Sequence, residues 1–483
     1  MMNFFKKLGR IKNLDYFLLG TVLLLGFLVR LYKITSPVAD WHSWRQADTA
    51  SVTRIYVEKG INLLLPRYHD ISSIQTGIYN PKGLRMVEFP IYNGIHALLV
   101  LTFPKLSLEI WGRMLSIIFS LISTVCLFAI GKKFMGRAGG ILSAFFFAFL
   151  PYNIYFSRVI LPEPAATAFA LISMYLFIKF IDTELDWQLY ISAVFFALSL
   201  LIKPFTFFYM LPLFYLLVKK YGFKKIFQNV KLVLAFDIAI APFFLWRIWV
   251  NQFPAGIPHF EWAFNGDKIR FRPAFWRWIF GERLGNLILG IWGILPFTLG
   301  ILKTATFNLL FLLGMLLYMT VVATASVRHD YYQIFIIPAV CLVLAQGVLN
   351  LWNSKEFKSP LVKVILVFSV LMMFGISAYQ VKEFYKINHP EIIEAGAAVD
   401  RLTPKDALVI APYNGDTAFL YQTERRGWPV VEESFDQVIA KGASFYVSVN
   451  FNDPDTKYVM EKYKVLEKTD NYVVVDLKNA RGK

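Results

Sequence analysis

Long runs of apolar residues recur through the first 380 residues of the chain, and each run is about as long as a membrane-spanning helix. Tyr16–Val29, Trp111–Ile130 and Leu361–Tyr379 are three of them. A helix of about 20 mostly apolar residues crosses the hydrocarbon core of a bilayer, and it pairs its own backbone groups where no water is available. With a mean hydropathy of +0.50 and only 17% charged residues, the chain is predicted to be an α-helical polytopic membrane protein.

Basic residues indicate how these helices are threaded. The net charge is +17, but residues 381–483 contain 14 Lys and Arg against 16 Asp and Glu, so the positive excess lies among the apolar runs. There it gathers in short loops, such as the one with Lys132 and Lys133, as the positive-inside rule predicts for cytoplasmic loops. It therefore implies no nucleic acid partner. Lys6 and Arg10, before the first run, likewise place the N-terminus inside.

The runs and basic loops together predict about eleven spans, and an odd number places the C-terminal tail outside. The predicted spans are at residues 15–33, 110–131, 138–156, 164–181, 187–202, 204–218, 229–250, 285–302, 305–325, 331–349 and 361–380.

Three segments outside the spans are long enough to carry functional structure. The first outer loop, residues 34–109, contains a helical pattern over Gln46–Lys59 and a broken apolar segment over Phe89–Leu106, both expected at the membrane interface. A second long outer loop, residues 251–284, mixes arginines with aromatic rings, as is typical of the headgroup region. The tail, residues 381–483, is predicted to be a small extracytoplasmic α/β domain. Its predicted strands are at residues 407–411, 444–449 and 472–477, and its helices at 391–402, 434–441 and 455–463.

Isolated ionisable residues gather on the predicted outer side of the spans. They are Asp40, His42, Arg45, Glu88, Arg158, Glu163, Lys203, Arg328, His329 and Asp330. Charged groups at a membrane are costly, so their gathering indicates a substrate path or a polar binding site. Segments far apart in the sequence thus bring carboxylates and cations to one face, where the phosphate of a lipid would lie.

Several short motifs hold these residues in a defined order along the chain. They are WHSWRQADTA at residues 41–50 after Asp40, Glu88-Phe89-Pro90, Ser157-Arg158, Leu161-Pro162-Glu163, Lys203-Pro204 and His329-Asp330-Tyr331-Tyr332. Together they resemble the GT-C superfamily, and more narrowly the protein O-mannosyltransferase and aminoarabinose transferase group, of the dolichyl-phosphate-mannose-protein mannosyltransferase type. The resemblance implies a GT-C fold with residues 1–380 as the catalytic membrane domain. It also implies a hexosyl or pentosyl transferase that uses a polyprenyl-phosphate sugar.

The resemblance assigns the two acidic positions Asp40 and Glu163 to catalysis. It implies that Asp40 acts as general base or organises the acceptor, and a base that takes the proton of an acceptor hydroxyl contributes about 10²- to 10⁴-fold in rate. Glu163 would share acid and base work or hold a divalent cation at the leaving phosphate. Structural roles are the alternatives: Asp40 as the cap of a helix that begins near Trp41, and Glu163 as the start of a span, where it complements the helix dipole.

Arg45, Lys203 and Arg158 are the predicted ligands of the donor phosphate. The leaving polyprenyl phosphate gains negative charge as the glycosidic bond breaks, so fixed cations stabilise the transition state. Arginine also offers a bidentate fork to phosphate. The alternative is that these side chains extend to ordinary lipid headgroups, as basic residues at span ends often do.

His42, Glu88, His329 and Tyr332 complete the set of candidate site residues. Glu88 matches a Glu of the aminoarabinose transferases, but Phe89 stands where that pattern has Lys, so the resemblance does not extend to that sugar. The cofactor requirement is open, with a divalent metal as the candidate, although no recognisable ligand spacing is present. The candidate metal ligands are Asp40, Glu163, Glu88 and His259.

The leading hypothesis is a glycosyltransferase of the cytoplasmic (inner) membrane, with its N-terminus inside and its C-terminal domain outside. It would move a sugar from a polyprenyl-phosphate donor to an acceptor hydroxyl of a protein, lipid or glycan at the outer face. The alternatives are a transporter or flippase of lipid-linked sugars and a non-catalytic membrane receptor. A transporter is expected to place its polar groups near the midplane in broken, often repeated helices, whereas here they gather at one face and the sequence contains no evident repeat.

Overall fold

The computed structural model describes residues 13–354 and 359–480, which group into two compact units. The first, named here the helical unit, has described residues 13–32, 114–245, 260–354 and 359–383. The second, named the sheet unit, contains residues 33–113, 246–259 and 384–480. The basic residues Lys6 and Arg10 lie outside the described residues.

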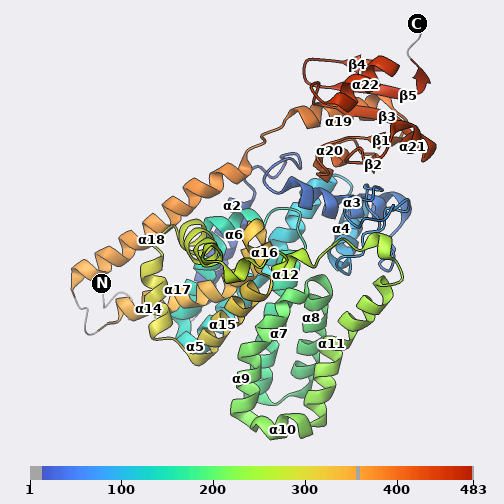
Figure 1. Cartoon of the computed structure of the whole chain (residues 1–483). Coiled ribbons are helices and arrows are strands. Elements are labelled where there is room, and N and C mark those ends of the chain that lie inside the picture. Colours follow the sequence, from blue (N-terminus) through green and yellow to red (C-terminus); the bar gives the residue numbers. More distant parts are fainter. Residues whose placement is uncertain (1–12, 355–358, 481–483) are drawn as a thin grey trace. The chain divides into compact units, whose positions relative to one another are not determined.

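Apolar helices of very different lengths make up the helical unit (Figure 1). One end of α5 and one end of α11 belong to the sheet unit. The helices are α2 (Leu14–Arg30), α5 (Leu108–Phe149), α6 (Pro151–Phe156), α7 (Glu163–Thr183), α8 (Asp186–Ile202), η1 (Pro204–Tyr209), α9 (Met210–Tyr221), α10 (Phe223–Gln228), α11 (Val230–Val250), α12 (Trp262–Asn265), η3 (Ile269–Phe271), α13 (Pro273–Trp276), η4 (Arg277–Ile288), α14 (Ile294–Leu302), α15 (Thr306–Val321), α16 (Ala323–Arg328), η5 (Asp330–Ile336), α17 (Ile337–Trp352), α18 (Pro360–Val381) and η6 (Lys382–Tyr385).

Among the described residues, five helices are long and apolar enough to cross a membrane. They are α5, α7, α11 and the continuous helices Asp330–Trp352 and Pro360–Tyr385. Three shorter apolar helices accompany them: α8, α15 and, in the sheet unit, α4 (Ile91–Thr102). The predicted α-helical membrane architecture is thus confirmed, while the count of eleven spans stays a prediction.

Glycine and proline interrupt the helices between predicted spans. Gly136, with φ 74°, breaks α5 between two predicted spans, a conformation that glycine adopts without steric cost. Helix α8 ends at Ile202 because Lys203, the residue before Pro204, is extended, and a residue before a proline avoids the helical conformation. Gly347 of α17 lies so close to the carbonyl of Pro296 in α14 that a Cβ would come within 1.7 Å of it. Small residues therefore set how closely these helices pack.

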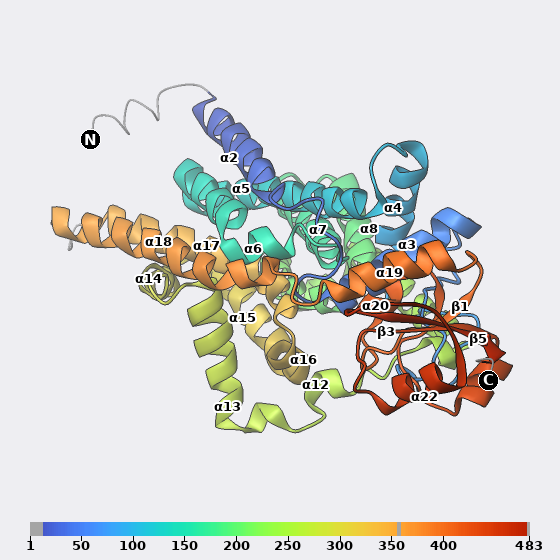
Figure 2. The ribbon, with the colours of Figure 1, turned by 90° about the horizontal axis from the view of Figure 1, so that it is seen from above.

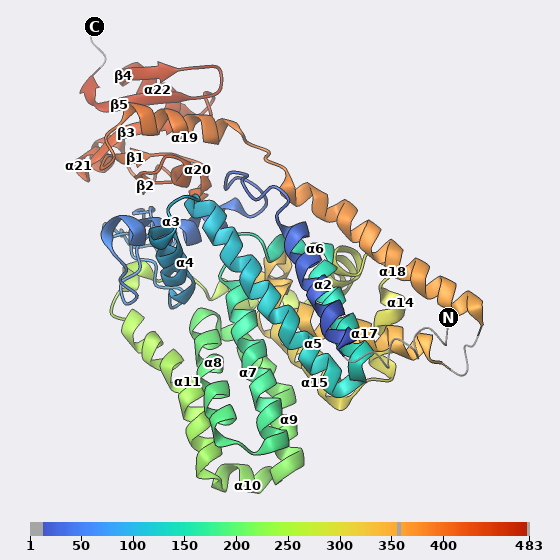
Figure 3. The same ribbon diagram turned by 180° about the vertical axis from the view of Figure 1, so that it is seen from behind.

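The first helix packs along α5, as Figure 3 shows. Leu19 and Val22 of α2 form a buried cluster with Phe128, Ala144 and Ala148, which come from both arms of α5. Arg30 at the end of α2 is also buried, and its guanidinium donates to Ser157 Oγ and to the carbonyl of Ala148, both at 2.8 Å. The first span thereby ends beside the turn that carries Arg158.

The sheet unit contains a five-stranded sheet with strand order β2-β1-β3-β5-β4. β1 pairs in parallel with β2 and β3, whereas β5 pairs antiparallel with β3 and β4. Figure 2 shows the sheet between α19 on one side and α22 on the other. The elements are α3 (Ser43–Lys59), α4, η2 (Pro254–Gly256), α19 (Glu391–Leu402), β1 (Leu408–Ile410), α20 (Thr417–Gln422), β2 (Arg426–Trp428), α21 (Phe435–Ala440), β3 (Ala443–Ser448), α22 (Pro454–Lys462), β4 (Tyr463–Lys468) and β5 (Val473–Ala480).

The predicted small α/β domain of the tail is therefore present, with all six of its predicted helices and strands. The sequence missed β2, β4 and α20. β2 and α20 are short, and β4 mixes charged with apolar side chains without regular alternation and follows α22 without a break. Short elements carry too little periodic pattern to be recognised alone.

Part of the first outer loop belongs to the same core as the tail. Ile71 donates its N–H to the carbonyl of Gly427 at 2.9 Å, and Gly427 donates to the carbonyl of His69 at 3.0 Å, so residues 69–71 pair along the free edge of β2. The Ile71 side chain is buried with Trp428 and Tyr446. This pairing covers an otherwise open sheet edge.

Candidate functional site

The predicted base Asp40 lies just before α3 and is buried, with 6% of its surface exposed. Its Oδ1 accepts a hydrogen bond from Gln46 Nε2 at 2.6 Å, and its carbonyl accepts one from Ser43 N at 3.0 Å. The alternative that Asp40 caps this helix is wrong, because the N-cap residue is His42. The Asp40 carboxylate is instead held from the side by a residue of the first turns of α3.

His42 adopts the left-handed conformation at the start of α3, with φ 54°. Its ring lies 5.1 Å from that of Trp41, which in turn stacks on Phe384 with ring centres 5.3 Å apart. A non-glycine residue with positive φ is uncommon and marks a constrained segment. The turn that carries Asp40 is thus constrained by the backbone conformation of His42 and by the packing of Trp41 on Phe384.

Arg45 and Glu88 form an ion pair within the sheet unit. Arg45 Nη2 lies 2.5 Å from Glu88 Oε1, and both side chains are largely buried. They line a cavity of about 10 Å³, which is small, together with Asp48, Arg85 and residues of α4 and the loop before it. The structure therefore brings one predicted phosphate ligand together with one of the additional site candidates, on segments 43 residues apart.

A second buried ion pair, between Asp48 and Arg85, lies beside the first. Arg85 Nη2 is 2.7 Å from Asp48 Oδ2, and Arg85 also donates to Gln75. Thr417 of α20 donates to Asp48 Oδ1 at 2.7 Å and also lies 3.2 Å from the carbonyl of Trp44. Sequence reasoning quoted Asp48 within a motif but gave it no role. Its position about one helical turn after Arg45, on the same face of the predicted helix, was the available signal.

Other contacts join α20 to the segment around Asp40. Gln422 donates to the carbonyl of Val38 at 2.8 Å, and Arg54 of α3 donates to the carbonyl of Tyr421 at 3.0 Å. The Tyr421 hydroxyl donates to Glu109 at 2.6 Å. The tail thus contributes directly to the shape of the segment that carries three candidate residues.

In the helical unit, Glu163 and Lys203 form a buried ion pair. Glu163 is the first residue of α7 and Lys203 immediately follows α8. Lys203 Nζ lies 3.1 Å from Glu163 Oε1, with side-chain exposures of 9% and 2%. Adjacent helices in sequence run antiparallel here, so the start of one meets the end of the other. Glu163 therefore fulfils the structural role of starting a span and also contacts a predicted phosphate ligand.

The segment with His329 and Tyr332 lies in the same unit. The ring of Tyr332 is 5.6 Å from Phe205, two residues beyond Lys203, and its carbonyl accepts from the Tyr318 hydroxyl at 3.1 Å. The His329 ring lies 5.7 Å from that of Trp262. Aromatic packing therefore brings Tyr332 to the neighbourhood of the Glu163–Lys203 pair.

Asp330, between these two residues, is also anchored. Arg283 Nη1 lies 3.4 Å from Asp330 Oδ2, and the Tyr152 hydroxyl donates to the Asp330 carbonyl at 2.6 Å. Arg158 is fully buried, with its guanidinium carbon 6.0 Å from the ring centre of Tyr155. Arg283 was missed as a site residue because its many arginine and aromatic neighbours in the second outer loop resembled a headgroup-facing segment.

The candidate residues thus form two groups, one in each unit. Asp40, His42, Arg45, Glu88 and His259 belong to the sheet unit; Arg158, Glu163, Lys203, His329 and Tyr332 belong to the helical unit. Among the described residues, no three His, Cys, Asp or Glu side chains lie together in a metal-binding arrangement. Two candidate ligands, Glu88 and Glu163, are instead paired with cations.

Burial changes the titration of carboxyl groups near α20. The pKa of Asp416, the N-cap residue of this helix, is raised to about 6, chiefly by burial. Burial likewise raises the pKa of Asp70 to about 6, and it lowers the pKa of His69 well below its ordinary value. The sheet unit therefore holds several groups whose protonation is coupled to its folding.

Comparison with known protein families identifies one match. Residues 96–249 match the family model described as dolichyl-phosphate-mannose-protein mannosyltransferase. This segment contains Arg158, Glu163 and Lys203. No curated protein matches the chain significantly.

Two solved structures share the fold of nearly the whole chain. ArnT from Cupriavidus metallidurans, bound to undecaprenyl phosphate, matches with a TM-score of 0.65 and 11% identity over 96% of this chain and 98% of that chain. The oligosaccharyltransferase from Archaeoglobus fulgidus, in complex with Zn and sulfate, matches with a TM-score of 0.57 and 10% identity over 88% of this chain and 67% of that one. At such identities the likeness concerns the fold, and the fold agrees with the GT-C architecture that the motifs predicted.

Proposed function

We propose that this chain, whose fold is shared with ArnT, is a GT-C glycosyltransferase that transfers a sugar from a polyprenyl-phosphate donor to an acceptor hydroxyl. The reaction takes place at the outer face of the cytoplasmic membrane, with the N-terminus inside and the C-terminal domain outside. The description of the matched family and the undecaprenyl phosphate bound to ArnT support a polyprenyl-phosphate donor. A fold alone does not define a reaction, so the argument rests on the residues of the site.

The observation that carries the proposal is the buried Asp40 carboxylate, held by Gln46 at 2.6 Å. A base must be fixed in orientation to take a proton in the transition state. The acceptor oxygen forms a bond to the anomeric carbon as its proton passes to Asp40. The bond from that carbon to the phosphate oxygen breaks, and the electron pair leaves with the polyprenyl phosphate. Direct attack of this kind inverts the configuration of the sugar.

The leaving phosphate is stabilised by the cations Arg45, Lys203 and Arg158. Two of them are held by carboxylates, Arg45 by Glu88 and Lys203 by Glu163. Such pairs keep long side chains in one geometry before the donor binds, which lowers the reorganisation needed in the transition state. Glu88 and Glu163 are therefore positioning residues in this scheme.

His42 in the sheet unit, and His329 and Tyr332 in the helical unit, are proposed to contact the sugar or acceptor. A divalent metal would need oxygen or imidazole ligands that converge, and in the described residues the candidate ligands do not form such a group. Chelation tests whether the reaction requires a divalent metal.

The experiment measures the release of polyprenyl phosphate in membranes that contain the protein, a panel of lipid-phosphate sugars and an acceptor extract. Asp40→Asn is expected to lower turnover by about 10²- to 10⁴-fold at equal expression, because the amide cannot accept the proton. Asp406→Asn, at an exposed position of the tail, is the matched control and is expected to retain activity. Parallel reactions with EDTA measure the metal requirement.

The outcomes separate the three functional classes. Undiminished turnover in Asp40→Asn removes Asp40 as the base. Movement of lipid-linked sugar across the membrane without release of polyprenyl phosphate indicates a transporter or flippase. Neither transfer nor movement with any donor indicates a receptor.

A further inference from the structure

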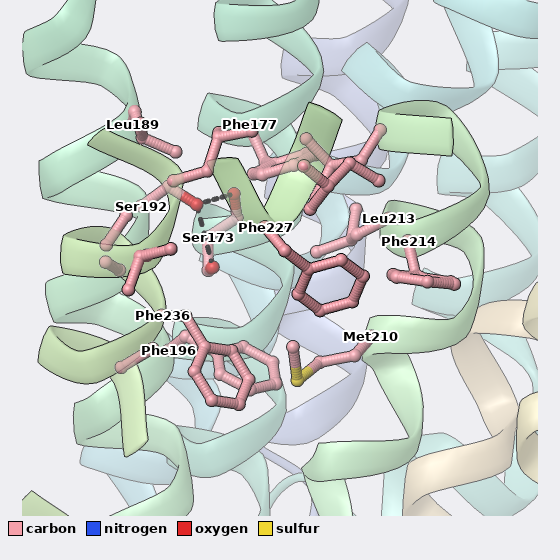
Figure 4. A pocket seen from close by; sticks show the side chains of 17 residues that line it. Ser173, Phe177, Leu189, Ser192, Phe196, Met210, Leu213, Phe214, Phe227 and Phe236 are labelled. Atoms are coloured by element: carbon pink, nitrogen blue, oxygen red, sulfur yellow. Dashed lines mark hydrogen bonds between the residues drawn. The ribbon is translucent and has the colours of Figure 1, made fainter. Parts of the chain in front are cut away.

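An apolar cavity of about 310 Å³ lies among five helices of the helical unit. It is roughly twice the volume of an apolar protein cavity that holds a benzene molecule, about 150 Å³. Figure 4 shows the aromatic rings of Phe177, Phe196, Phe214, Phe227 and Phe236 around it. The other lining side chains come from the same helices, α7, α8, α9, α10 and α11.

The cavity offers hydrocarbon contact and no polar group that needs a ligand. Ser173 and Ser192 are its hydroxyl-bearing residues, and they satisfy each other: their oxygens are 3.0 Å apart, and Ser192 Oγ is 2.8 Å from the carbonyl of Ser173. One wall is buried, as shown by Leu189 at 2% exposure, while Phe227 at 63% lies at the open side. A cavity of this kind favours a flexible apolar chain over a polar solute.

A cluster of lysines lies at the end of this helix group where α9 leads through α10 to α11. Residues 219–231 contain five lysines and no acidic residue. Lys220 and Lys231 pair with Glu184 and Asp186 at 2.7 and 2.5 Å. The other three, Lys219, Lys224 and Lys225, are exposed.

The short helix α10 joins the cavity to these lysines. Ile226 and Phe227 line the cavity, whereas the adjacent Lys224 and Lys225 are exposed. The exposed ring of Phe223 packs against Phe227 with centres 5.4 Å apart. Exposed aromatic rings beside lysines are typical of a segment at the level of lipid headgroups. The apolar chamber thus ends beside a positively charged rim.

We propose that this cavity binds an acyl chain of an anionic glycerophospholipid, whose phosphate contacts Lys224 and Lys225. Basic residues near a membrane surface attract anionic headgroups, and burial of acyl methylenes in an apolar cavity adds a second favourable contribution. A neutral phospholipid would gain the second contribution and not the first. Charge complementarity therefore selects the headgroup, and the cavity selects a chain.

The site is separate from the proposed donor site and does not depend on the proposed function. Ser173 is ten residues further along α7 than Glu163, a distance of about 15 Å along a helix axis. Lys203 stands after the last residue of α8, while α8 begins at Asp186, which pairs with Lys231 of the basic rim. A phosphate at Lys224 and Lys225 therefore lies at the opposite helix ends from Glu163 and Lys203.

Native mass spectrometry of the full-length protein in detergent tests this assignment. The protein is titrated with phosphatidylglycerol, phosphatidylcholine or undecaprenyl phosphate, and the first bound lipid is quantified. Phosphatidylglycerol is expected to bind about ten-fold more tightly than phosphatidylcholine. Lys224→Gln with Lys225→Gln is expected to remove that preference while leaving binding of the neutral lipid unchanged.

A cavity-filling variant and its neighbour test the chain-binding part. Ala193→Phe places a ring in the cavity and is expected to lower the occupancy of the first lipid at least ten-fold. Val194→Phe, on the same helix but 43% exposed and outside the cavity, is expected to bind as the wild type does. Ala239→Leu on α11 is a milder filling variant, and melting in lipid-free detergent verifies that each variant is folded. Equal binding in Ala193→Phe and Val194→Phe, equal affinity for both phospholipids, or a preference for undecaprenyl phosphate overturns the proposal.

Discussion

The two predicted catalytic carboxylates are held by different means in the two units. Glu163 of the helical unit is paired with the ammonium of Lys203 at 3.1 Å, whereas Asp40 of the sheet unit accepts from the amide of Gln46 at 2.6 Å. Among apolar helices an opposite charge is the compact way to compensate a buried carboxylate. Loops and short helices provide more donors, so a buried carboxylate there can be held by neutral hydrogen bonds.

The surroundings of the two carboxylates differ as well. Asp48, two residues beyond Gln46, combines both means, with Arg85 at 2.7 Å and the Thr417 hydroxyl at 2.7 Å. The sheet unit therefore distributes its buried polar groups over a network, while Glu163 and Lys203 of the helical unit form a direct ion pair. Loss of one member of the Glu163–Lys203 pair should accordingly lower the free energy of unfolding more than loss of one member of the network in the sheet unit.

The largest effect is expected for Glu163→Gln. This change leaves the buried Lys203 without its carboxylate, and breaking a buried pair typically costs about 3–5 kcal/mol in the free energy of unfolding. Thermal melting of the detergent-solubilised protein measures the loss. The double variant Glu163→Gln with Lys203→Met removes the buried charge, so its stability should recover while the KM for the donor rises. A double variant as unstable as Glu163→Gln would contradict the ion-pair explanation.

The next effect concerns pH and the network of the sheet unit. The pKa of Asp416 is raised from 3.8 to about 6 by burial. Between these values the unfolded chain has lost the proton that the folded chain keeps. The contribution of Asp416 to stability is therefore greatest below about pH 4 and falls as the pH rises toward 6. The difference between the two pKa values corresponds to about 3 kcal/mol.

Asp416→Asn is expected to reduce this fall in stability, because an amide does not titrate and Asn is also a good N-cap. Melting temperatures between pH 4 and 7 measure it, with the exposed Asp406→Asn as control. Asp70, whose pKa is also raised to about 6, should retain its own share of the pH dependence. Identical slopes in wild type and Asp416→Asn would show that the folded state does not hold the Asp416 proton.

A smaller effect is expected for Thr417→Val, which tests how the tail is joined to α3. Valine removes the hydroxyl that donates to Asp48 but keeps the shape of the threonine side chain. A hydrogen bond to a charged group contributes about 1.5–3 kcal/mol, and the value here should lie near the lower limit because Arg85 still pairs with Asp48. Denaturant unfolding measures the difference. Thr417→Ser, which keeps the hydroxyl, should remain close to wild type; equal losses in both variants would assign the effect to packing.

The smallest effect is expected for Gln46→Leu. Without the amide, Asp40 loses one orienting contact and keeps its place in the chain. We expect kcat to fall about ten-fold, which corresponds to about 1.4 kcal/mol, with little change in the KM for the donor. The exposed Gln228→Leu serves as control. A raised KM with unchanged kcat would instead place Gln46 in substrate binding.

Much of the fold followed from local patterns in the sequence. Apolar runs long enough to span a bilayer indicated the helices, because the bilayer requires a backbone that pairs within each segment. The spans predicted at residues 187–202 and 204–218 meet at Lys203 and Pro204, where the structure also ends one helix and begins another. Motif order indicated the GT-C fold, and the comparisons support it. Asp40, Arg45, Glu163 and Lys203 could be named as candidates because isolated charged residues gather on one predicted side of the spans and lie in motifs that resemble the GT-C superfamily.

Partners, in contrast, could not be read from the sequence. Glu163 and Lys203 are 40 positions apart, and Arg45 and Glu88 are 43 apart. The sequence placed the first outer loop with the membrane region, yet Asp48 contacts Thr417 across 369 positions, and residues 69–71 complete the edge of the tail's sheet. Sequence spacing carries no information on such contacts, since chain reversal at any loop can produce them.

By itself the sequence determined the class of protein, the approximate positions of its helices and the residue types available for chemistry. Those properties depend on hydrophobicity and backbone preference, which act over a few turns of chain. Only the tertiary structure decided which charge meets which, that Gln46 holds Asp40, and that five helices enclose a cavity beside the lysines of α10. Such arrangements arise from packing between distant segments, where shape and burial determine which side chains come into contact.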